Sequence, residues 1–247
     1  MYLSSLEITN VRNLQNVSIL PHHRTNFIVG PNGSGKTSLL ESISLLSNGR
    51  SFRNSDTRKL IRSSTSNLVV FGRVLEDANS SGESRIGFTK AVNGDTQVKI
   101  NGVSKNRVSD LAKVIPTIAI DSNSIDVIEG GPAVRRSLLD WGMFHVEPSY
   151  LSIWSQYRIA LKNKNALLKS ARDNATAELI HWNRVLADYG TQLDTLRVAY
   201  VEQLRNCFNG VAASYLEYEA EPGFLYSPGW NKDRYPQLDA CLNSQMT

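Results

Sequence analysis

The stretch that decides the fold is Gly30-Pro31-Asn32-Gly33-Ser34-Gly35-Lys36-Thr37, which matches the phosphate-loop pattern G-x-x-x-x-G-K-[ST]. A chain of this length matches the bare pattern by chance on the order of once in a hundred times, so the flanking sequence matters. The apolar run over residues 25–29 predicts a strand before the loop. A helical pattern over residues 35–46 follows it, with its predicted apolar face at Leu39, Leu40, Ile43 and Leu46. Strand, loop and helix together favour a nucleotide site over a glycine-rich turn with an incidental lysine.

Each residue type in this loop has a chemical task. The glycines let backbone N–H groups turn inward around phosphate oxygens, and the helix that follows adds its positive N-terminal end. Lys36 reaches the β- and γ-phosphates, and the Thr37 hydroxyl coordinates Mg²⁺. The loop therefore predicts binding of a nucleoside triphosphate, ATP, with Mg²⁺ as its metal ion.

A phosphate loop alone does not hydrolyse ATP, because a second carboxylate must hold Mg²⁺ through water and a further group must orient the attacking water. Asp121 follows the apolar run of residues 117–120, where such a carboxylate usually stands. No acidic residue follows Asp121 directly and no serine- and glycine-rich signature precedes it, so we interpret it as a decoy. No catalytic residue is assigned, and the scattered histidines show no metal-ligand spacing.

Two regions of different character follow from the hydrophobic periodicity. Strands are predicted at residues 3–8, 17–20, 68–75, 85–90, 97–100 and 114–120. After Asp121 the pattern is helical, with one helix at residues 132–144 and then two long helices packed antiparallel around a turn near residues 171–176. The second long helix carries a heptad seam of Leu179, Trp182, Leu186, Tyr189, Leu193, Leu196 and Tyr200.

That seam fits both an ordinary helical core hairpin and a projecting arm. Beyond residue 221 no closing element is recognisable in the sequence. The predicted organisation is an ATP-binding lobe over residues 1–121, with the loop and a β-rich subdomain, and a helical domain over residues 122–247 that is incomplete at its C-terminal end.

Composition sets broad limits on class and compartment. The chain has 247 residues, 41% of them hydrophobic and 20% charged, which is typical of a globular protein. A net charge of +4 is compatible with a polyanionic partner. Two cysteines without metal-ligand spacing favour a reducing compartment. Since no charged leader and no bilayer-length apolar stretch is seen, we expect a soluble, cytoplasmic protein without a membrane partner.

A cluster of basic residues follows the predicted loop helix and is called the basic segment. Its members are Arg50, Arg53, Arg58, Lys59 and Arg62, within thirteen residues that hold one acid, Asp56. Such a cluster can neutralise DNA phosphates, although a solvated surface is the other interpretation. No interleaved aromatic residues suggest a base-stacking platform, so contacts to the DNA backbone are expected.

Several segments together resemble the SMC/Rad50-like branch of ABC ATPases and, within it, the RecF family. Glu7-Ile8-Thr9-Asn10-Val11-Arg12-Asn13-Leu14 is similar to the opening of that branch. Gly49-Arg50-Ser51-Phe52-Arg53 and Arg135-Arg136-Ser137-Leu138-Leu139-Asp140 are similar to RecF segments and are far more specific than the phosphate loop. The resemblance extends from about residue 3 to about residue 205.

This resemblance implies an α/β fold: a P-loop NTPase of ABC/Rad50-head type with a mixed sheet and an inserted helical domain formed by an antiparallel helix pair. It implies binding of ATP and of single-stranded or gapped DNA, and ATP-dependent homodimerisation of the full-length protein. It also implies slow hydrolysis, and recombinase loading together with RecO and RecR in DNA repair, replication, recombination and the SOS response. Arg12 and Asn13 lie where related heads contact the nucleotide, while a plain turn between two strands is the alternative.

The sequence departs from the family pattern in two ways. Val11 stands where the family usually has an aromatic residue, and after residue 205 neither a Ser-x-Gly-Gln signature nor a strand ending in paired acids is found. We therefore expect this chain to hold about the front two-thirds of a longer protein, and to bind ATP with negligible turnover.

Two other function classes share the phosphate loop. Another ABC-type ATPase subunit that drives a partner protein is the main alternative, although residues 49–53 and the lack of a stacking aromatic before the loop disfavour a transporter subunit. A small-molecule kinase would need an arginine-bearing lid and a substrate pocket directly after the loop, which the β-rich middle fits poorly. DNA binding with and without ATP separates these classes.

Overall fold

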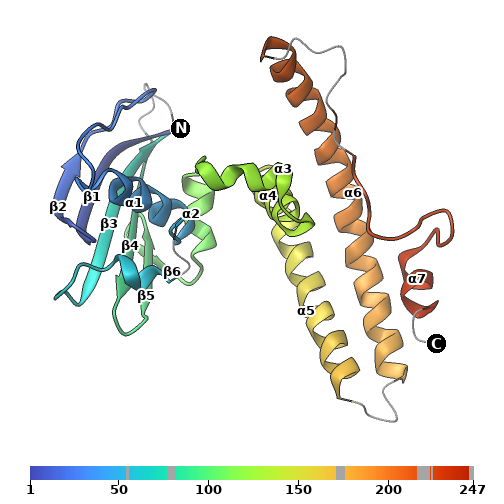
Figure 1. Cartoon of the computed structure of the whole chain (residues 1–247). Coiled ribbons are helices and arrows are strands. Elements are labelled where there is room, and N and C mark those ends of the chain that lie inside the picture. Colours follow the sequence, from blue (N-terminus) through green and yellow to red (C-terminus); the bar gives the residue numbers. More distant parts are fainter. Residues whose placement is uncertain (54–55, 77–81, 171–175, 216–222, 224, 245–247) are drawn as a thin grey trace. The chain divides into compact units, whose positions relative to one another are not determined.

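The chain forms two compact units, Met1–Ser124 and Ile125–Thr247. The computed structural model describes residues 1–53, 56–76, 82–170, 176–215, 223 and 225–244. Figure 1 shows the strands in the first unit and the long helices in the second. No helix among these residues has the length and apolar character needed to cross a membrane.

The first unit is built on a six-stranded sheet in the order β2-β1-β3-β4-β5-β6. Its strands are β1 (Tyr2–Val11), β2 (Leu14–Ile19), β3 (Asn67–Leu75), β4 (Glu83–Ala91), β5 (Thr96–Ile100) and β6 (Val103–Lys105). Alternating side chains of β3 face the core, with Leu68, Val70 and Val74 buried, as the period of two in its sequence predicts. Asn101 and Gly102 both have positive φ in the turn that joins β5 to β6.

The sheet is antiparallel at every recorded pairing, whereas a mixed sheet was expected. Two of the predicted strands are not formed, which explains this correction. Residues 25–29 and 115–120 belong to no β-ladder in the structure. Helix α2 (Ser109–Val114) ends where the second of these strands was predicted to begin. A strand needs a hydrogen-bonded neighbour, and neither segment has one in the described part of the chain. As a result Phe27 is 88% exposed and Ile120 is 83% exposed.

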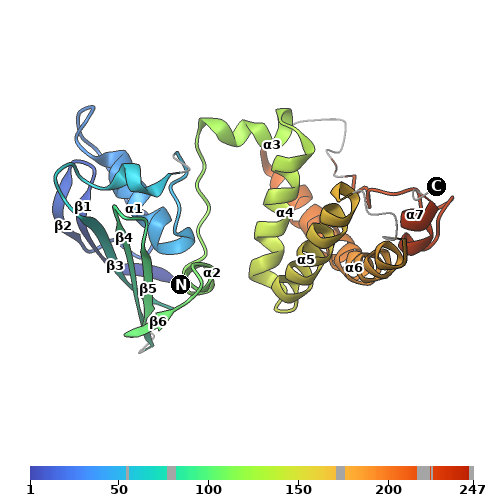
Figure 2. The ribbon, with the colours of Figure 1, turned by 90° about the horizontal axis from the view of Figure 1, so that it is seen from below.

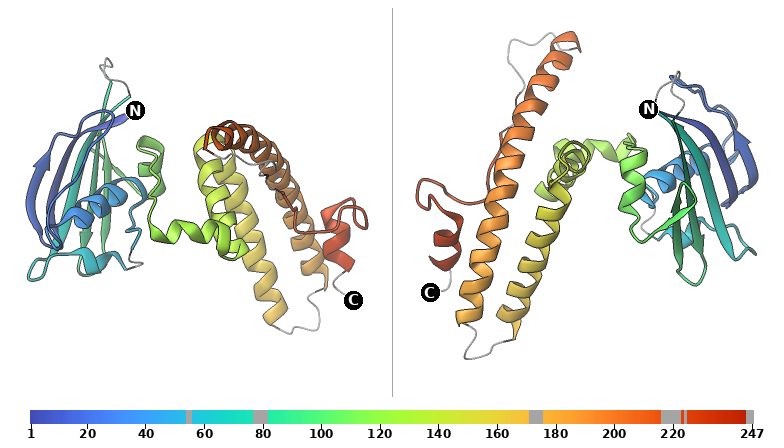
Figure 3. Two further views of the ribbon diagram at one scale, coloured as in Figure 1. Left: turned by 45° about the horizontal axis from the view of Figure 1, so that its top comes forward. Right: turned by 180° about the vertical axis from the view of Figure 1, so that it is seen from behind.

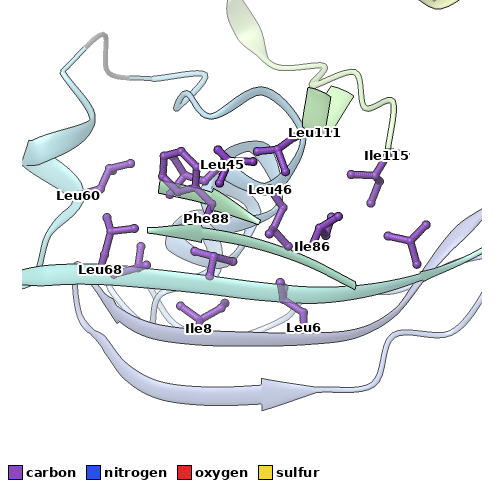
Figure 4. Close-up of a cluster of buried hydrophobic side chains, with 14 residues drawn as sticks. Leu6, Ile8, Leu45, Leu46, Leu60, Leu68, Ile86, Phe88, Leu111 and Ile115 are labelled. Atoms are coloured by element: carbon purple, nitrogen blue, oxygen red, sulfur yellow. The ribbon is translucent and has the colours of Figure 1, made fainter. Parts of the chain in front are cut away.

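Helix α1 (Lys36–Asn48) packs against one face of the sheet and forms the core of this unit with it (Figure 2). Figure 4 shows the buried cluster in which Leu45 and Leu46 of α1 meet Phe88 and Ile86 of β4 and Leu6 of β1. Leu60, from the short 3-10 helix η1 (Thr57–Leu60), and Leu111 of α2 close the cluster. The core thus fixes α1, and with it the end of the phosphate loop, to the middle of the sheet.

The core-facing side of α1 includes three of the four predicted apolar residues together with polar ones: Leu46 is buried, and Leu39 and Ile43 pack against the core. Leu40 is 46% exposed, whereas Glu41, Ser42, Leu45 and Leu46 are buried. The polar groups tolerate burial because they are bonded: Ser42 Oγ donates to a carbonyl within the helix, and Glu41 is ion-paired. Apolar periodicity therefore predicted the core side of this helix except at Leu40, and it did not reveal the polar residues that share that side.

The second unit consists of helices, of which two long ones pack side by side and antiparallel (Figure 3). After η2 (Ser122–Ile125) they are α3 (Asp126–Glu129), α4 (Pro132–Val146), α5 (Tyr150–Lys169), α6 (Thr176–Tyr215) and α7 (Leu238–Ser244). The predicted helix at Pro132 and the antiparallel pair α5 and α6 are present. The turn was predicted near residues 171–176, of which residues 171–175 lie outside the described residues and Thr176 begins α6.

Helix α6 buries residues outside the predicted heptad seam as well as residues within it. Leu186 and Leu193 of the seam are buried, but so are Asn183 and Asp194 beside it. Asn183 Nδ2 donates to Asn243 of α7, and Asp194 accepts from Tyr226 Oη at 2.9 Å. A closing element thus exists after residue 221, and it was not predicted because α7 is short.

Candidate functional site

The phosphate loop owes its backbone path to glycines at positions that other residues rarely occupy. Gly33 and Gly35 have φ values of 80° and 101°, in the left-handed region. A Cβ at Gly35 would also lie 2.6 Å from Leu14 Cδ2, so this glycine lets the loop pack on the start of β2. Leu39 N donates to the Gly35 carbonyl at 2.9 Å, and α1 begins directly after the loop.

The lysine of the loop is folded back over it. Lys36 Nζ donates to the carbonyls of Gly30 and Pro31 at 2.7 and 2.9 Å. Residues 30–34 are exposed, so an anion can reach the loop from solvent. Because the first N–H groups of a helix have no carbonyl partner within it, the start of α1 offers donors and a positive end at the same place. This arrangement can hold a phosphate group beside the Lys36 ammonium.

Asn13 ties the turn between β1 and β2 to this loop. Its Nδ2 donates to the Gly33 carbonyl at 2.9 Å, and its Oδ1 accepts from Ser38 Oγ at 3.0 Å. Asn13 is exposed and lies against both the loop and the first turn of α1. Of the two predicted turn residues, this one contacts the loop directly.

Arg12 is directed instead towards Glu41, on α1. Arg12 NH2 donates to Oε1 at 2.8 Å, and Nε lies 2.8 Å from Oε2. Glu41 is fully buried and also accepts from Ser51 Oγ at 2.5 Å. Glu41 was not predicted as a site residue from the sequence, although one signal was available: a charged residue stands four positions before Leu45, within the buried face of a helix.

The cations of the basic segment differ in whether they have a hydrogen-bonded partner. Asp56 accepts from Arg58 Nε at 3.0 Å and from Arg58 NH2 at 2.9 Å; these bonds hold the pKa of Asp56 at about 2 and raise that of Arg58. Arg62 NH1 donates to the Asn13 carbonyl at 3.0 Å. Arg50, Arg53 and Lys59 are exposed, and no ion pair is recorded for them in the described part of the chain.

Asp121 lies in a turn, outside any acidic cluster among the described residues. Asp121 Oδ1 accepts from the backbone N–H of Asn123 at 2.9 Å, so it holds the turn into η2. Within the described ranges no three His, Cys, Asp or Glu side chains gather in a way that could bind a metal ion. The Thr37 hydroxyl, which is half-buried at the start of α1, remains the predicted Mg²⁺ ligand.

The family of the chain follows from comparison with known proteins. The model of the RecF/RecN/SMC N terminal domain matches residues 2–208. The chain belongs to this family. The DNA replication and repair protein RecF of Vibrio cholerae serotype O1 is 39% identical over 236 residues, which is 95% of this chain and 64% of that relative. RecF of Pseudomonas syringae pv. syringae is 36% identical over 246 residues, which is 100% of this chain and 65% of that relative.

Solved structures give the same result for the fold. The recombination mediator protein RecF-ATP in the RecFOR pathway has a TM-score of 0.82 at 27% identity, covering 99% of this chain and 67% of that one. A second RecF structure, RecF-ATPrS, has a TM-score of 0.77 at 30% identity, over 87% of this chain and 58% of that one. The resemblance to RecF and the predicted fold class of an ABC/Rad50-type head are therefore confirmed. The chain spans 64% of the length of the first of these curated relatives.

Proposed function

We propose that this chain carries the ATP-binding and DNA-binding functions of a RecF-type DNA replication and repair protein. One observation carries the proposal: the short turn between β1 and β2 contacts both the phosphate loop and the basic segment. Asn13 donates to the loop at Gly33, and its own carbonyl accepts from Arg62. A nucleotide site and a cationic surface that share a residue in this way suit an ATP-dependent DNA-binding protein better than a kinase.

The nucleotide part of the proposal is ATP with Mg²⁺ on the loop Gly30, Pro31, Asn32, Gly33, Ser34, Gly35, Lys36 and Thr37. The open loop, the Lys36 ammonium above it and the start of α1 supply the groups that a triphosphate requires. The solved structure of a RecF relative is named RecF-ATP, which supports this choice of nucleotide. Arg12 and Asn13 complete the proposed site, with Asn13 nearer to the loop.

The DNA part of the proposal is the basic segment Arg50, Arg53, Arg58, Lys59 and Arg62. Arg50, Arg53 and Lys59 are exposed and have no ion pair within the described residues, so they can neutralise phosphates of single-stranded or gapped DNA. While bound to DNA through this surface, the full-length protein would act with RecO- and RecR-like mediators in recombinational repair. It would form a homodimer when ATP is bound. The description of a relative within the RecFOR pathway supports these partners.

Equilibrium binding of a fluorescent ATP analogue tests the nucleotide site. Lys36→Ala should abolish binding while leaving the fold intact, since the hydrogen bonds of its ammonium within the described residues go to loop carbonyls. Lys59→Ala, a change of the same kind outside the loop, serves as the control and should bind as the parent does. Unchanged affinity of Lys36→Ala would refute the site.

A further inference from the structure

Glu41 is a fully buried carboxylate between the two parts of the proposed site. Burying a charge is strongly unfavourable unless partners satisfy it. Its partners come from two different segments: the Arg12 guanidinium approaches both carboxylate oxygens at 2.8 Å, and Ser51 Oγ donates at 2.5 Å. Glu41 therefore fixes both segments relative to α1, the helix that begins at the phosphate loop.

The first segment is the turn that carries Arg12 and Asn13. Arg12 has a φ of 49°, a left-handed conformation that a residue with a side chain keeps only when its surroundings hold it there. The Arg12 N–H donates to the Leu60 carbonyl at 2.7 Å, and Val11 forms an isolated bridge with Ile61. The turn thus contacts the phosphate loop through Asn13 and the end of the basic segment through its backbone.

The second segment is residues 49–53, at the start of the basic segment. Ser51 lies between the exposed residues Arg50 and Arg53, and its hydroxyl bond to Glu41 sets where this short stretch lies. Ser44 Oγ, one turn further along α1, donates to the Arg50 carbonyl at 2.8 Å. Both ends of the basic segment are therefore attached to elements that also hold the phosphate loop.

We propose that Glu41 is a positioning residue that couples nucleotide binding at the loop to DNA binding at the basic segment. This inference rests on the proposed function and adds the residue through which the two sites influence each other. Phosphate binding reorganises the loop and the first turn of α1, and Glu41 transmits the shift to Arg12 and Ser51. Coupling between two sites is reciprocal, so DNA must affect ATP affinity by the same factor as ATP affects DNA affinity.

The test is a pair of titrations that measures this coupling factor. DNA affinity is measured with and without ATP, and ATP affinity with and without DNA, for the parent chain, Glu41→Gln and Ser51→Ala. The parent should show a factor of about five or more in both directions. Glu41→Gln keeps the size of the side chain but cannot accept from the guanidinium at both positions, and its factor should fall below about two. Ser51→Ala removes one hydroxyl and should give an intermediate factor.

Matched controls separate coupling from general damage. Glu7→Gln neutralises an exposed carboxylate on β1, and Ser18→Ala removes an exposed hydroxyl on β2; both should keep the parent factor. A purely structural role of Glu41 would lower stability or each affinity alone and leave the factor unchanged, which would overturn the inference. If Glu41→Gln does not fold, the coupling factor of Ser51→Ala is the test. A coupling factor in Ser51→Ala equal to that of the parent chain would then overturn the inference.

The parent chain distinguishes the two proposals. If it binds both ATP and DNA with a factor near one, the coupling inference fails while the proposed function stands. If it binds neither ligand, the proposed function fails and the inference with it.

Discussion

Each unit contains a carboxylate that accepts hydrogen bonds from an arginine and a hydroxyl, yet the two carboxylates hold different things together. Glu41 binds Arg12 and Ser51, which lie on a turn and a loop of the first unit. Asp140, on α4 of the second unit, accepts from Tyr150 Oη at 2.5 Å and from Arg197 NH2 at 2.7 Å, which lie on α5 and α6. Trp154 of α5 also donates to Asp140, at 3.3 Å.

Glu41 and Asp140 have similar hydrogen-bond donors but differ in burial and in the elements around them. The Glu41 side chain is fully buried beside exposed loops, whereas the Asp140 side chain is 29% exposed among regular helices. A network between helices stabilises packing, while a network between loops sets the geometry of whatever those loops bind. Changes in the first unit should therefore alter binding, and changes in the second should alter stability.

The largest expected effect on binding comes from Gly35→Ala. The new Cβ would lie 2.6 Å from Leu14 Cδ2, so the Leu14 side chain or the loop must shift, and the left-handed backbone adds a strain of about 1–3 kcal/mol. Nucleotide affinity, measured by equilibrium titration, should fall by about tenfold or more. Gly33→Ala is the matched control, because its φ is also positive but no atom lies within 4 Å of the added Cβ. Equal losses in both variants would contradict the role given to the Leu14 contact.

The corresponding change in the second unit is Asp140→Asn. Removing this charge leaves the Arg197 guanidinium without its ion-pair partner, and the free energy of unfolding should fall by about 1–3 kcal/mol. ATP affinity should stay at the parent value. Urea unfolding measures the first quantity, with Asp188→Asn on the exposed side of α6 as the control. Lost nucleotide binding in folded Asp140→Asn would break the distinction between the two units.

The two units also differ in how far the sequence predicted them. The phosphate loop was recognisable because glycine at a left-handed position and lysine at the helix start are chemical requirements that local sequence must satisfy. The strands β1 to β5 followed from their alternation. The segments at residues 25–29 and 115–120 did not, since apolar composition predicts a strand but cannot supply its partner.

Other features depend on contacts between distant residues, which periodicity cannot reveal. Glu41 meets Ser51 ten residues away and Arg12 twenty-nine residues away, and neither spacing is a known motif. The bond between Asp56 and Arg58 is local, but the sequence did not show that these two side chains pair rather than face solvent or DNA. The helix α7 was missed because a seven-residue helix has too few turns to show a period.

A smaller effect is expected from removing the exposed cations of the basic segment. On duplex DNA, alanine at Arg50, Arg53 and Lys59 should reduce the slope of log affinity against log salt by about 2.7, since each lost phosphate contact removes about 0.9. The loss should be the same for two unrelated DNA sequences, because contacts to the backbone carry no sequence information. Alanine at the exposed residues Lys162, Lys169 and Arg184 of the second unit is the control. A reduced slope in the control alone would place the DNA surface on the helices.

The smallest effect is expected from a substitution that strengthens the salt dependence of DNA binding instead of weakening it. Asp56 is ionised at neutral pH, with a pKa held at about 2 by Arg58, so it withholds one cation from DNA. Asp56→Asn should free Arg58 and steepen the salt dependence by about 0.9. Salt titration of this variant beside the parent measures the change. An unchanged slope would mean that Arg58 does not reach DNA even when unpaired.

Amide hydrogen exchange with and without ATP and Mg²⁺ tests the central claim most directly, because it locates binding without any substitution. The account predicts slower exchange at residues 30–38, where N–H groups would donate to phosphate oxygens, together with a change at residues 10–14 through Asn13. It predicts no change along α5 and α6. Protection confined to α5 and α6, with the loop unchanged, would contradict the placement of the nucleotide site in the first unit.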